Sequence, residues 1–197
     1  MTNNEKILKY MEDNCGTITT KEVVENGISR SQLTQLLKAG IIERVIRGVY
    51  VSSNAWGDEF FNLMSQSKNA VFSHNTALYF QNLTDQTPYI FDITVPRGYN
   101  GLLQKNKRVH LFYVKRDLYN LGLIKIKSPQ GKMIRSFNVE RTICDILRSE
   151  NRMNAETVKN TIKAYLQSSN QNIYMLHDYA KQFRVDNKLN HYMEVLL

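Results

Sequence analysis

The chain has few of the residues and segments that mark several classes of protein. Its 197 residues include 2 cysteines, 3 prolines and 9 glycines. Cys15 and Cys144 lie far apart, which indicates buried thiols in a reducing compartment and not a disulfide framework. The scarcity of proline and glycine argues against long disordered linkers. No apolar run approaches the roughly 18 residues of a membrane span, and the opening MTNNEKILKYMEDN lacks a signal-peptide pattern. We therefore expect a cytoplasmic protein.

Patterns of catalytic and metal-binding residues are also missing. The four histidines show no metal-ligand spacing with one another or with cysteine; they are His74, His110, His177 and His191. Ser73 and His74 stand at a predicted helix start, which is typical of a cap and its neighbour and not of a nucleophile facing its base. The segment SPQGK at 128–132 lacks the phosphate-loop pattern and predicts a hairpin turn. We expect no enzyme activity, no metal and no cofactor.

Positive charge is abundant and unevenly distributed. The net charge is +8 and the isoelectric point about 9.4, which favours a polyanionic partner such as nucleic acid. Residues 1–53 carry seven Lys/Arg and six Asp/Glu, whereas residues 97–135 carry ten Lys/Arg and only Asp117 as an acid. The ten cations are Arg97, Lys105, Lys107, Arg108, Lys115, Arg116, Lys125, Lys127, Lys132 and Arg135.

Residues 1–53 predict three helices followed by a β-hairpin. Apolar spacing predicts a helix over 3–14, ended by Gly16. Thr19 with Glu22 predicts a capping box and a short second helix, and the Ser29–Gln32 segment predicts another box at the start of a third helix. Gly40 ends that helix, and strands are expected over 41–46 and 49–51. This order is that of a winged helix-turn-helix domain.

The third helix presents a polar face that suits DNA. Leu33, Leu36 and Leu37 share one face, so the opposite face carries short polar and basic side chains. Such groups can contact base edges and phosphates when a helix enters the major groove. The expected DNA-binding residues are Arg30, Ser31, Thr34, Gln35 and Lys38 on the helix, with Arg44 and Arg47 on the wing. The alternative is a winged helix used only for protein contacts.

Residues 58–197 predict a larger α+β domain. Asp58 and Ser73 are expected to cap two helices, and Trp56 in the short joint is expected to pack between the two domains. Four strands and four further helices follow, giving a mostly antiparallel sheet with C-terminal helices. The strands are expected over 89–95, 109–114, 121–127 and 132–137, and the helices over 139–148, 154–167, 172–183 and 186–196.

The basic segment suggests a second surface for DNA. If Lys105, Lys107, Lys125 and Lys127 alternate along strands, they line one face of the sheet. Together with Arg97 and Arg108, they would then contact phosphates that flank the operator. The alternative is a solvated face without a role in DNA binding.

Nearly the whole chain resembles the AbiEi antitoxins of type IV toxin–antitoxin, or abortive-infection, systems. The segments that carry the resemblance are VFSHNTALYFQNLTD at 71–85, FDITVPRG at 91–98 and IRSFNVERTICDIL at 134–147, after the winged helix. The resemblance implies a phage-defence antitoxin that also represses its own operon by binding inverted repeats in double-stranded DNA. It also implies that the second domain counters a nucleotidyltransferase-like toxin without a stable complex, and that the chain is a monomer in solution that binds DNA cooperatively.

Two other functions stay open at the sequence level. A winged-helix regulator with a ligand-sensing second domain would show an apolar pocket with convergent polar groups in residues 58–197. A nucleic-acid enzyme would need a cluster of acids in a cleft.

Overall fold

The chain divides into two compact units. The structure, a computed structural model, describes residues 1–55 and 57–196. Unit 1 comprises Met1–Lys68 and Ile126–Ile134, and unit 2 comprises Asn69–Lys125 and Arg135–Leu197. Trp56, which we expected to pack between the domains, lies outside the described residues. The expected division into domains 1–53 and 58–197 stays a prediction.

Unit 1 contains the winged helix-turn-helix. Ile7, Met11, Val23, Leu33 and Leu36 form its core, each at most 2% exposed. The wing strands belong to an antiparallel three-stranded sheet of order β1-β3-β2. The elements are α1 (Asn3–Glu12), β1 (Thr17–Thr19), α2 (Thr20–Glu25), α3 (Ser31–Lys38), β2 (Ile42–Ile46), β3 (Val49–Ser52) and α4 (Glu59–Ser65).

The capping pattern confirms two of the expected helix starts and corrects a third. The capping box of Thr19 and Glu22 is present at α2, and Asp58 caps α4 by accepting from the Phe61 N–H. The box expected at Ser29–Gln32 is wrong, because Arg30 is the N-cap and makes no side-chain cap bond. The Gln32 N–H, which the box requires, instead donates to the Ser29 carbonyl at 3.1 Å.

A distant hairpin tip completes unit 1. Residues 126–134 include the turn expected at 128–132, where the Gly131 N–H donates to the Ser128 carbonyl at 2.8 Å and Gly131 has φ +85°. The Lys132 ammonium, in a side chain only 7% exposed, lies 3.3 Å from a Glu22 carboxylate oxygen. The Ser128 hydroxyl donates to the buried carboxylate of Asp58. The tip is therefore packed into unit 1 by buried polar contacts.

The second sheet is mixed, with strand order β6-β5-β4-β8-β7. β4 pairs antiparallel with β5, but β4 with β8 and β5 with β6 are parallel pairs. The sheet is therefore mixed and not mostly antiparallel as expected, because β8 runs parallel to β4 and β6 runs parallel to β5. The strands are β4 (Val71–Phe72), β5 (Phe91–Pro96), β6 (Val109–Val114), β7 (Leu123–Lys127) and β8 (Met133–Phe137).

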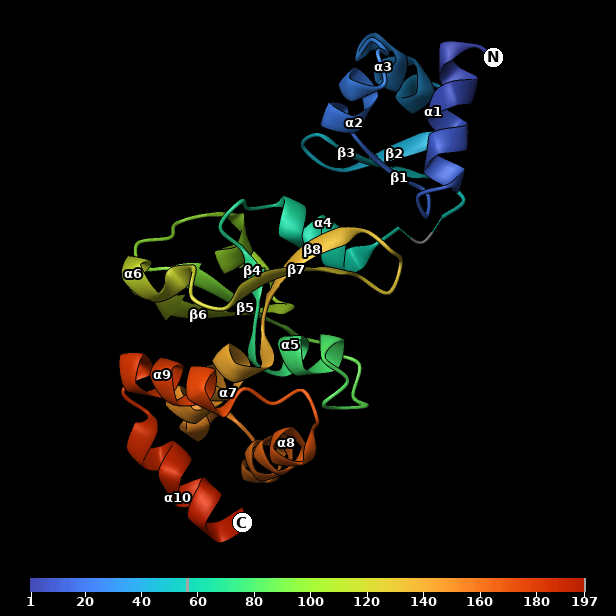
Figure 1. Cartoon of the computed structure of the whole chain (residues 1–197). Helices are drawn as coiled ribbons and strands as arrows, with labels where there is room; N and C mark the ends of the chain where they lie inside the picture. The colour runs from blue at the N-terminus through green and yellow to red at the C-terminus, as the bar shows by residue number, and fades with distance from the viewer. Residues whose placement is uncertain (56, 197) are drawn as a thin grey trace. The chain divides into compact units, whose positions relative to one another are not determined.

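The helices of unit 2 include the four C-terminal helices that the sequence predicts, as Figure 1 shows. Their core includes Ile143, Leu147, Ile162, Leu176 and Leu189, each fully buried. None of the described helices is both long and apolar enough to cross a membrane. The helical segments are α5 (His74–Phe80), η1 (Leu102–Lys105), α6 (Arg116–Tyr119), α7 (Val139–Arg148), η2 (Glu150–Arg152), α8 (Ala155–Gln167), α9 (Ile173–Phe183) and α10 (Asp186–Leu196).

Candidate nucleic-acid interface

Helix α3 presents its polar face to solvent, as its periodicity predicts. Leu33 and Leu36 are each 2% exposed and fix the opposite face against the unit 1 core. The expected base-reading side chains are exposed; they are Ser31, Thr34, Gln35 and Lys38. An exposed face of hydroxyl, amide and ammonium groups offers both donors and acceptors to base edges.

The wing is held in place at its tip. Its turn uses Gly48 at φ +83°, and the Thr20 N–H at the start of α2 donates to the Gly48 carbonyl at 2.9 Å. Arg44 and Arg47 are both exposed, and the Arg44 Nε donates to the Ile46 carbonyl at 3.3 Å. The wing arginines therefore project from a hairpin that is anchored to the helix-turn-helix.

Arg30 lies with the wing arginines around one depression. This concave surface has a volume of about 620 Å³, and Arg30, Arg44 and Arg47 all line it. Lys21, also on its wall, pairs with Glu25 at 3.4 Å. Guanidinium groups around a concavity suit a phosphate, which each can contact by two hydrogen bonds. The sequence did not indicate this grouping, because helical spacing places Arg30 with α3 and says nothing of the hairpin.

The second set of cations does not lie on one sheet face. Lys105 is the last residue of η1 and Lys107 lies in the turn before β6, whereas Lys125 and Lys127 lie on β7. Because Lys105 and Lys107 lie outside the strands, the expectation that these four lysines alternate along strands is wrong. The segment that contains Lys105 is a 3-10 helix and not a strand, and its Leu103 is fully buried.

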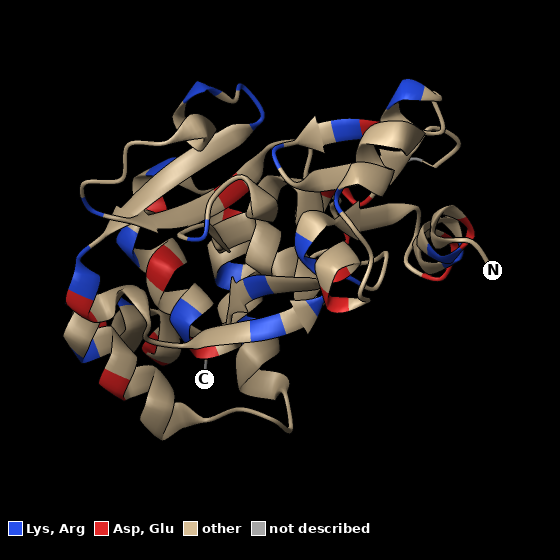
Figure 2. Cartoon of the chain, turned by 90° about the horizontal axis from the view of Figure 1, so that it is seen from above, with Lys and Arg blue, Asp and Glu red and all other residues tan. Residues whose placement is uncertain are grey.

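Several cations of the basic segment have structural partners. Lys132 pairs with Glu22, as described above. The Arg108 guanidinium lies 5.0 Å from the Tyr89 ring centre and 5.1 Å from that of Phe91. Arg97, Lys105, Lys107, Lys125 and Lys127 are exposed, and Figure 2 shows basic residues distributed over many elements. A role in DNA binding for the second set of cations, from Arg97 to Lys127, stays a prediction.

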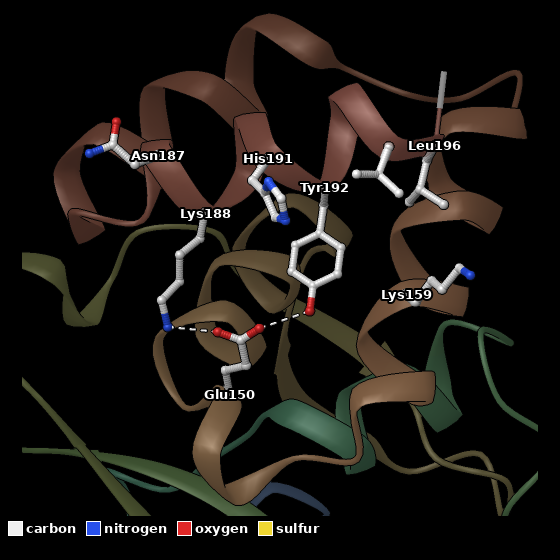
Figure 3. Close-up of a pocket in the computed structure, with 8 residues that line it drawn as sticks. Glu150, Lys159, Asn187, Lys188, His191, Tyr192 and Leu196 are labelled. Carbon is white, nitrogen blue, oxygen red and sulfur yellow. Dashed lines mark hydrogen bonds and ion pairs between the residues drawn. The ribbon is translucent and has the colours of Figure 1, made fainter.

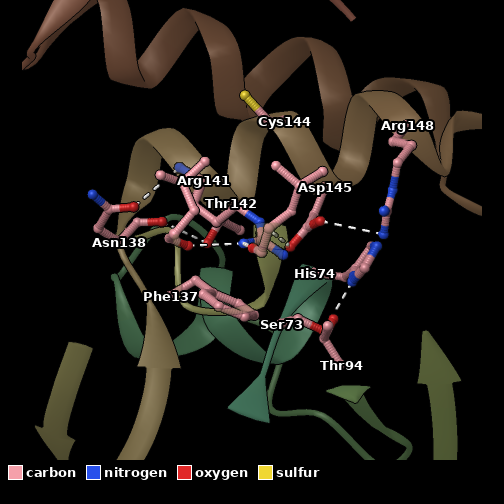
Figure 4. Close-up of polar contacts among 12 residues, drawn as sticks. Ser73, His74, Thr94, Phe137, Asn138, Arg141, Thr142, Cys144, Asp145 and Arg148 are labelled. Atoms are coloured by element: carbon pink, nitrogen blue, oxygen red, sulfur yellow. Dashed lines mark hydrogen bonds and ion pairs between the residues drawn. The ribbon is translucent and has the colours of Figure 1, made fainter. Parts of the chain in front are cut away.

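Ser73 and His74 form a buried polar pair. The expectation that these side chains do not face each other is wrong, since His74 Nδ1 lies 2.9 Å from Ser73 Oγ. The backbone of His74 has φ +47°. Ser73 makes no side-chain cap bond and accepts from the Thr94 hydroxyl at 2.9 Å. His74 Nε2 lies 3.1 Å from Ser149 Oγ. Burial lowers the pKa of His74 to about 4, which keeps the ring neutral. Figure 4 shows His74 beside Ser73.

The part of the IRSFNVERTICDIL segment that lies on α7 also contributes side chains to the interior. Arg141 is fully buried, and its Nε donates to an Asp145 carboxylate oxygen at 3.1 Å. Its Nη1 donates to the carbonyls of Leu118 and Leu121 at 2.8 Å each. Burial lowers the pKa of Arg141 and raises that of the Cys144 thiol to about 12. The expectation that both thiols are buried is wrong for Cys15, which is exposed in the turn between α1 and β1. Within residues 1–55 and 57–196, no group of three His, Cys, Asp or Glu side chains could hold a metal ion.

A pocket of about 480 Å³ lies in unit 2 beside α10 (Figure 3). Glu150 forms part of its wall, with one carboxylate oxygen 2.8 Å from the Lys188 ammonium and the other accepting from the Tyr192 hydroxyl at 2.8 Å. These bonds lower the pKa of Glu150. Val195 and Leu196 add apolar surface, and Lys159, Asn187 and His191 complete the lining.

Comparison with known proteins identifies the N-terminal segment. Residues 5–53 match the family described as "Transcriptional regulator, AbiEi antitoxin". No curated protein matches the chain. Among solved structures, the RV2827C protein from Mycobacterium tuberculosis aligns over 100% of this chain and 81% of its own, with a TM-score of 0.53 and 11% identity. At that identity the likeness shows the fold alone. The resemblance to AbiEi antitoxins is confirmed at residues 5–53, the segment that matches the model of this regulator family.

Proposed function

We propose that the protein represses its own operon by binding inverted repeats in double-stranded DNA. The observation that carries this proposal is the exposed polar face of α3 beside the arginine-lined depression of the wing. In this arrangement Ser31, Thr34, Gln35 and Lys38 enter the major groove. Arg30, Arg44 and Arg47 contact the phosphates on either side and set the register of the helix.

Binding of the full chain to its own promoter fragment tests the proposal. Gln35→Ala and Lys38→Ala should each weaken binding by about 1–3 kcal/mol if the side chain reads a base. Lys9→Ala is the matched control, because Lys9 is an exposed lysine on α1, away from the proposed reading face. Unchanged affinity in both α3 variants and in Arg47→Ala would exclude this surface.

We further propose that the chain is a cytoplasmic antitoxin of a type IV system acting in phage defence. It counters a nucleotidyltransferase-like toxin without a stable complex, and it is a monomer in solution that binds its repeats cooperatively. Repression requires access to the chromosome, which places the protein in the cytoplasm. We propose no enzyme activity, since the Ser73–His74 pair is fully buried and a substrate could not reach it.

A second candidate is a regulator whose unit 2 senses a small ligand. The pocket beside α10 favours it, because its volume lies in the range of small-molecule sites. A thermal-shift screen of the full chain against organic acids and sugar phosphates tests it. A rise in Tm that His191→Ala abolishes would support sensing, and no rise with any compound would leave the repressor–antitoxin proposal alone.

A further inference from the structure

The two edge strands of the five-stranded sheet differ in how well they are protected against pairing with another strand. At one edge, β7 carries Lys125 and Lys127, both exposed. Lysines on an edge strand are a common device that prevents another strand from pairing with it. At the other edge, β6 reads Val-His-Leu-Phe-Tyr-Val and carries no lysine. The β6 edge therefore lacks the protection that the β7 edge has.

The outward backbone groups of β6 are available for pairing. The carbonyls of Arg108 and Val114 accept from the N–H groups of Phe91 and Arg97, each at 2.8 Å. A strand in a parallel pair uses alternate residues to bond its neighbour, so Leu111 and Tyr113 direct their N–H and C=O groups away from β5. In the part of the chain that the structure describes, no hydrogen bond reaches these groups.

Apolar side chains also lie exposed at this edge. Tyr113 is 43% exposed and Leu102, in the adjoining η1, is 66% exposed. The Tyr113 hydroxyl accepts from the Gln104 Nε2 at 3.2 Å, which joins η1 to β6. An open edge with exposed aromatic and aliphatic side chains suits an added polypeptide strand.

The segment that contains and flanks β6 is rich in positive charge. Residues 97–116 contain six cations and no acid. Asp92, which lies opposite His110 in the strand register, is only 3% exposed and its carboxylate accepts from the Asn75 N–H at 3.1 Å. The six cations are Arg97, Lys105, Lys107, Arg108, Lys115 and Arg116.

We propose that β6 binds an acidic, extended segment of a partner protein as an added strand. The segment exchanges backbone hydrogen bonds with Leu111 and Tyr113, and its carboxylates lie against the flanking cations. A second copy of this chain fits poorly, because pairing β6 with β6 would place these cations against their own counterparts. Nucleic acid would use the cations but not the outward backbone groups.

A display library of random short peptides tests the proposal. Peptides that bind the full-length chain are selected, and peptides that also bind a Tyr113→Lys variant are removed. Tyr113→Lys gives β6 the lysine that β7 has. We expect enriched peptides to alternate Asp or Glu with β-branched or aromatic residues. Synthetic versions should bind about tenfold more weakly to Tyr113→Lys and to Lys105→Glu/Lys107→Glu. The matched controls are Leu123→Lys on β7 and Lys159→Glu/Lys163→Glu on α8, which should bind as the unaltered chain does.

Backbone methylation of the best peptide tests strand addition itself. Methylating the alternate amides that face β6 should abolish binding, whereas methylating the intervening amides should not. No enrichment, equal binding to Tyr113→Lys, or equal effects of the two methylation patterns would overturn the proposal. A loss of DNA affinity in Lys105→Glu/Lys107→Glu without peptide binding would assign the surface to nucleic acid instead. Self-association that Tyr113→Lys abolishes would assign it to a second copy.

Discussion

His74 is a neutral histidine built into the interior of unit 2. Its ring stacks on Phe112 with 3.5 Å between ring centres and has a serine hydroxyl near each nitrogen. Burial lowers its pKa to about 4, whereas an unfolded histidine titrates near 6.5. Between these values the unfolded chain binds a proton that the folded chain does not bind, so stability falls as the pH is lowered.

We predict that His74 makes the fold sensitive to mild acid. The two pKa values imply that this residue removes about 2 kcal/mol of unfolding free energy between pH 7 and pH 5. His74→Asn keeps a residue that tolerates positive φ and should remove that part of the pH dependence. Urea unfolding at both pH values measures it, with His191→Asn at an exposed position as the control. Equal pH dependence in His74→Asn and the unaltered chain would contradict the prediction.

Arg141 and Asp145 form an ion pair whose two side chains are both fully buried. The Arg141 guanidinium lies 4.1 Å from the Phe137 ring centre and 4.3 Å from that of Phe183, so it cannot reach water when its partner is removed. Asp145→Asn should therefore cost about 3–5 kcal/mol of unfolding free energy, the usual penalty for an unpaired buried charge. Asp178→Asn on the exposed face of α9 is the control and should change stability by less than about 0.5 kcal/mol. A loss below about 1 kcal/mol in Asp145→Asn would show that the charge is compensated elsewhere.

At the scale of elements, α3 and the wing should make different kinds of contact. An arginine on phosphate contributes about 0.9 to the slope of log K against log salt and acts on every sequence alike. We therefore predict that Arg47→Ala lowers this slope by about one and weakens operator and unrelated DNA equally. Gln35→Ala should leave the slope unchanged and weaken only the operator. Equal sequence dependence in the two variants would show that the wing and α3 do not divide these roles.

Most elements could be predicted from local sequence, and the errors have a common cause. The four C-terminal helices could be predicted because they are long enough for apolar periodicity to appear. In the structure, Asn caps at residues 138, 154 and 172 begin three of them. β1 and β4 have three and two residues, too few for any periodicity to appear. The parallel pairing of β4 with β8 joins Phe72 to Ser136, and no local signal reports such a distant partner. For the same reason the exposure of Gln35 was predictable, but the grouping of Arg30 with Arg47 was not.

At the scale of the whole molecule, repression and antitoxicity should be separable by surface substitutions. We predict that the full chain with Arg30→Ala, Gln35→Ala and Lys38→Ala loses promoter repression but still rescues growth when the nucleotidyltransferase-like toxin is co-expressed. These three side chains are exposed on unit 1 and are not part of the unit 1 core. A promoter fusion and a growth assay in the same strain measure both activities. Loss of rescue by a variant with unaltered Tm would show that the two activities share a surface.

The β7 lysines test whether DNA contact extends beyond the winged helix. If Lys125 and Lys127 contact flanking phosphates, Lys125→Gln/Lys127→Gln should lower the salt slope of the full chain by about two. Lys159→Gln/Lys163→Gln removes the same charge from α8 and should leave the slope unchanged. Equal slopes in both double variants would mean that these lysines serve only to protect the edge of the sheet.

The packing of the 126–134 hairpin tip into unit 1 also determines when unit 1 can be completed during synthesis of the chain. Residues 1–68 leave the ribosome early, but the partner of Glu22 is Lys132, which is translated much later. A nascent chain that stops before the tip emerges leaves the buried Asp58 carboxylate without the Ser128 hydroxyl. Domains generally fold as units while they are synthesised, so unit 1 is completed only after Ile126–Ile134 has been translated. A translation product that ends before residue 126 therefore lacks the tip and cannot form all the buried contacts of unit 1.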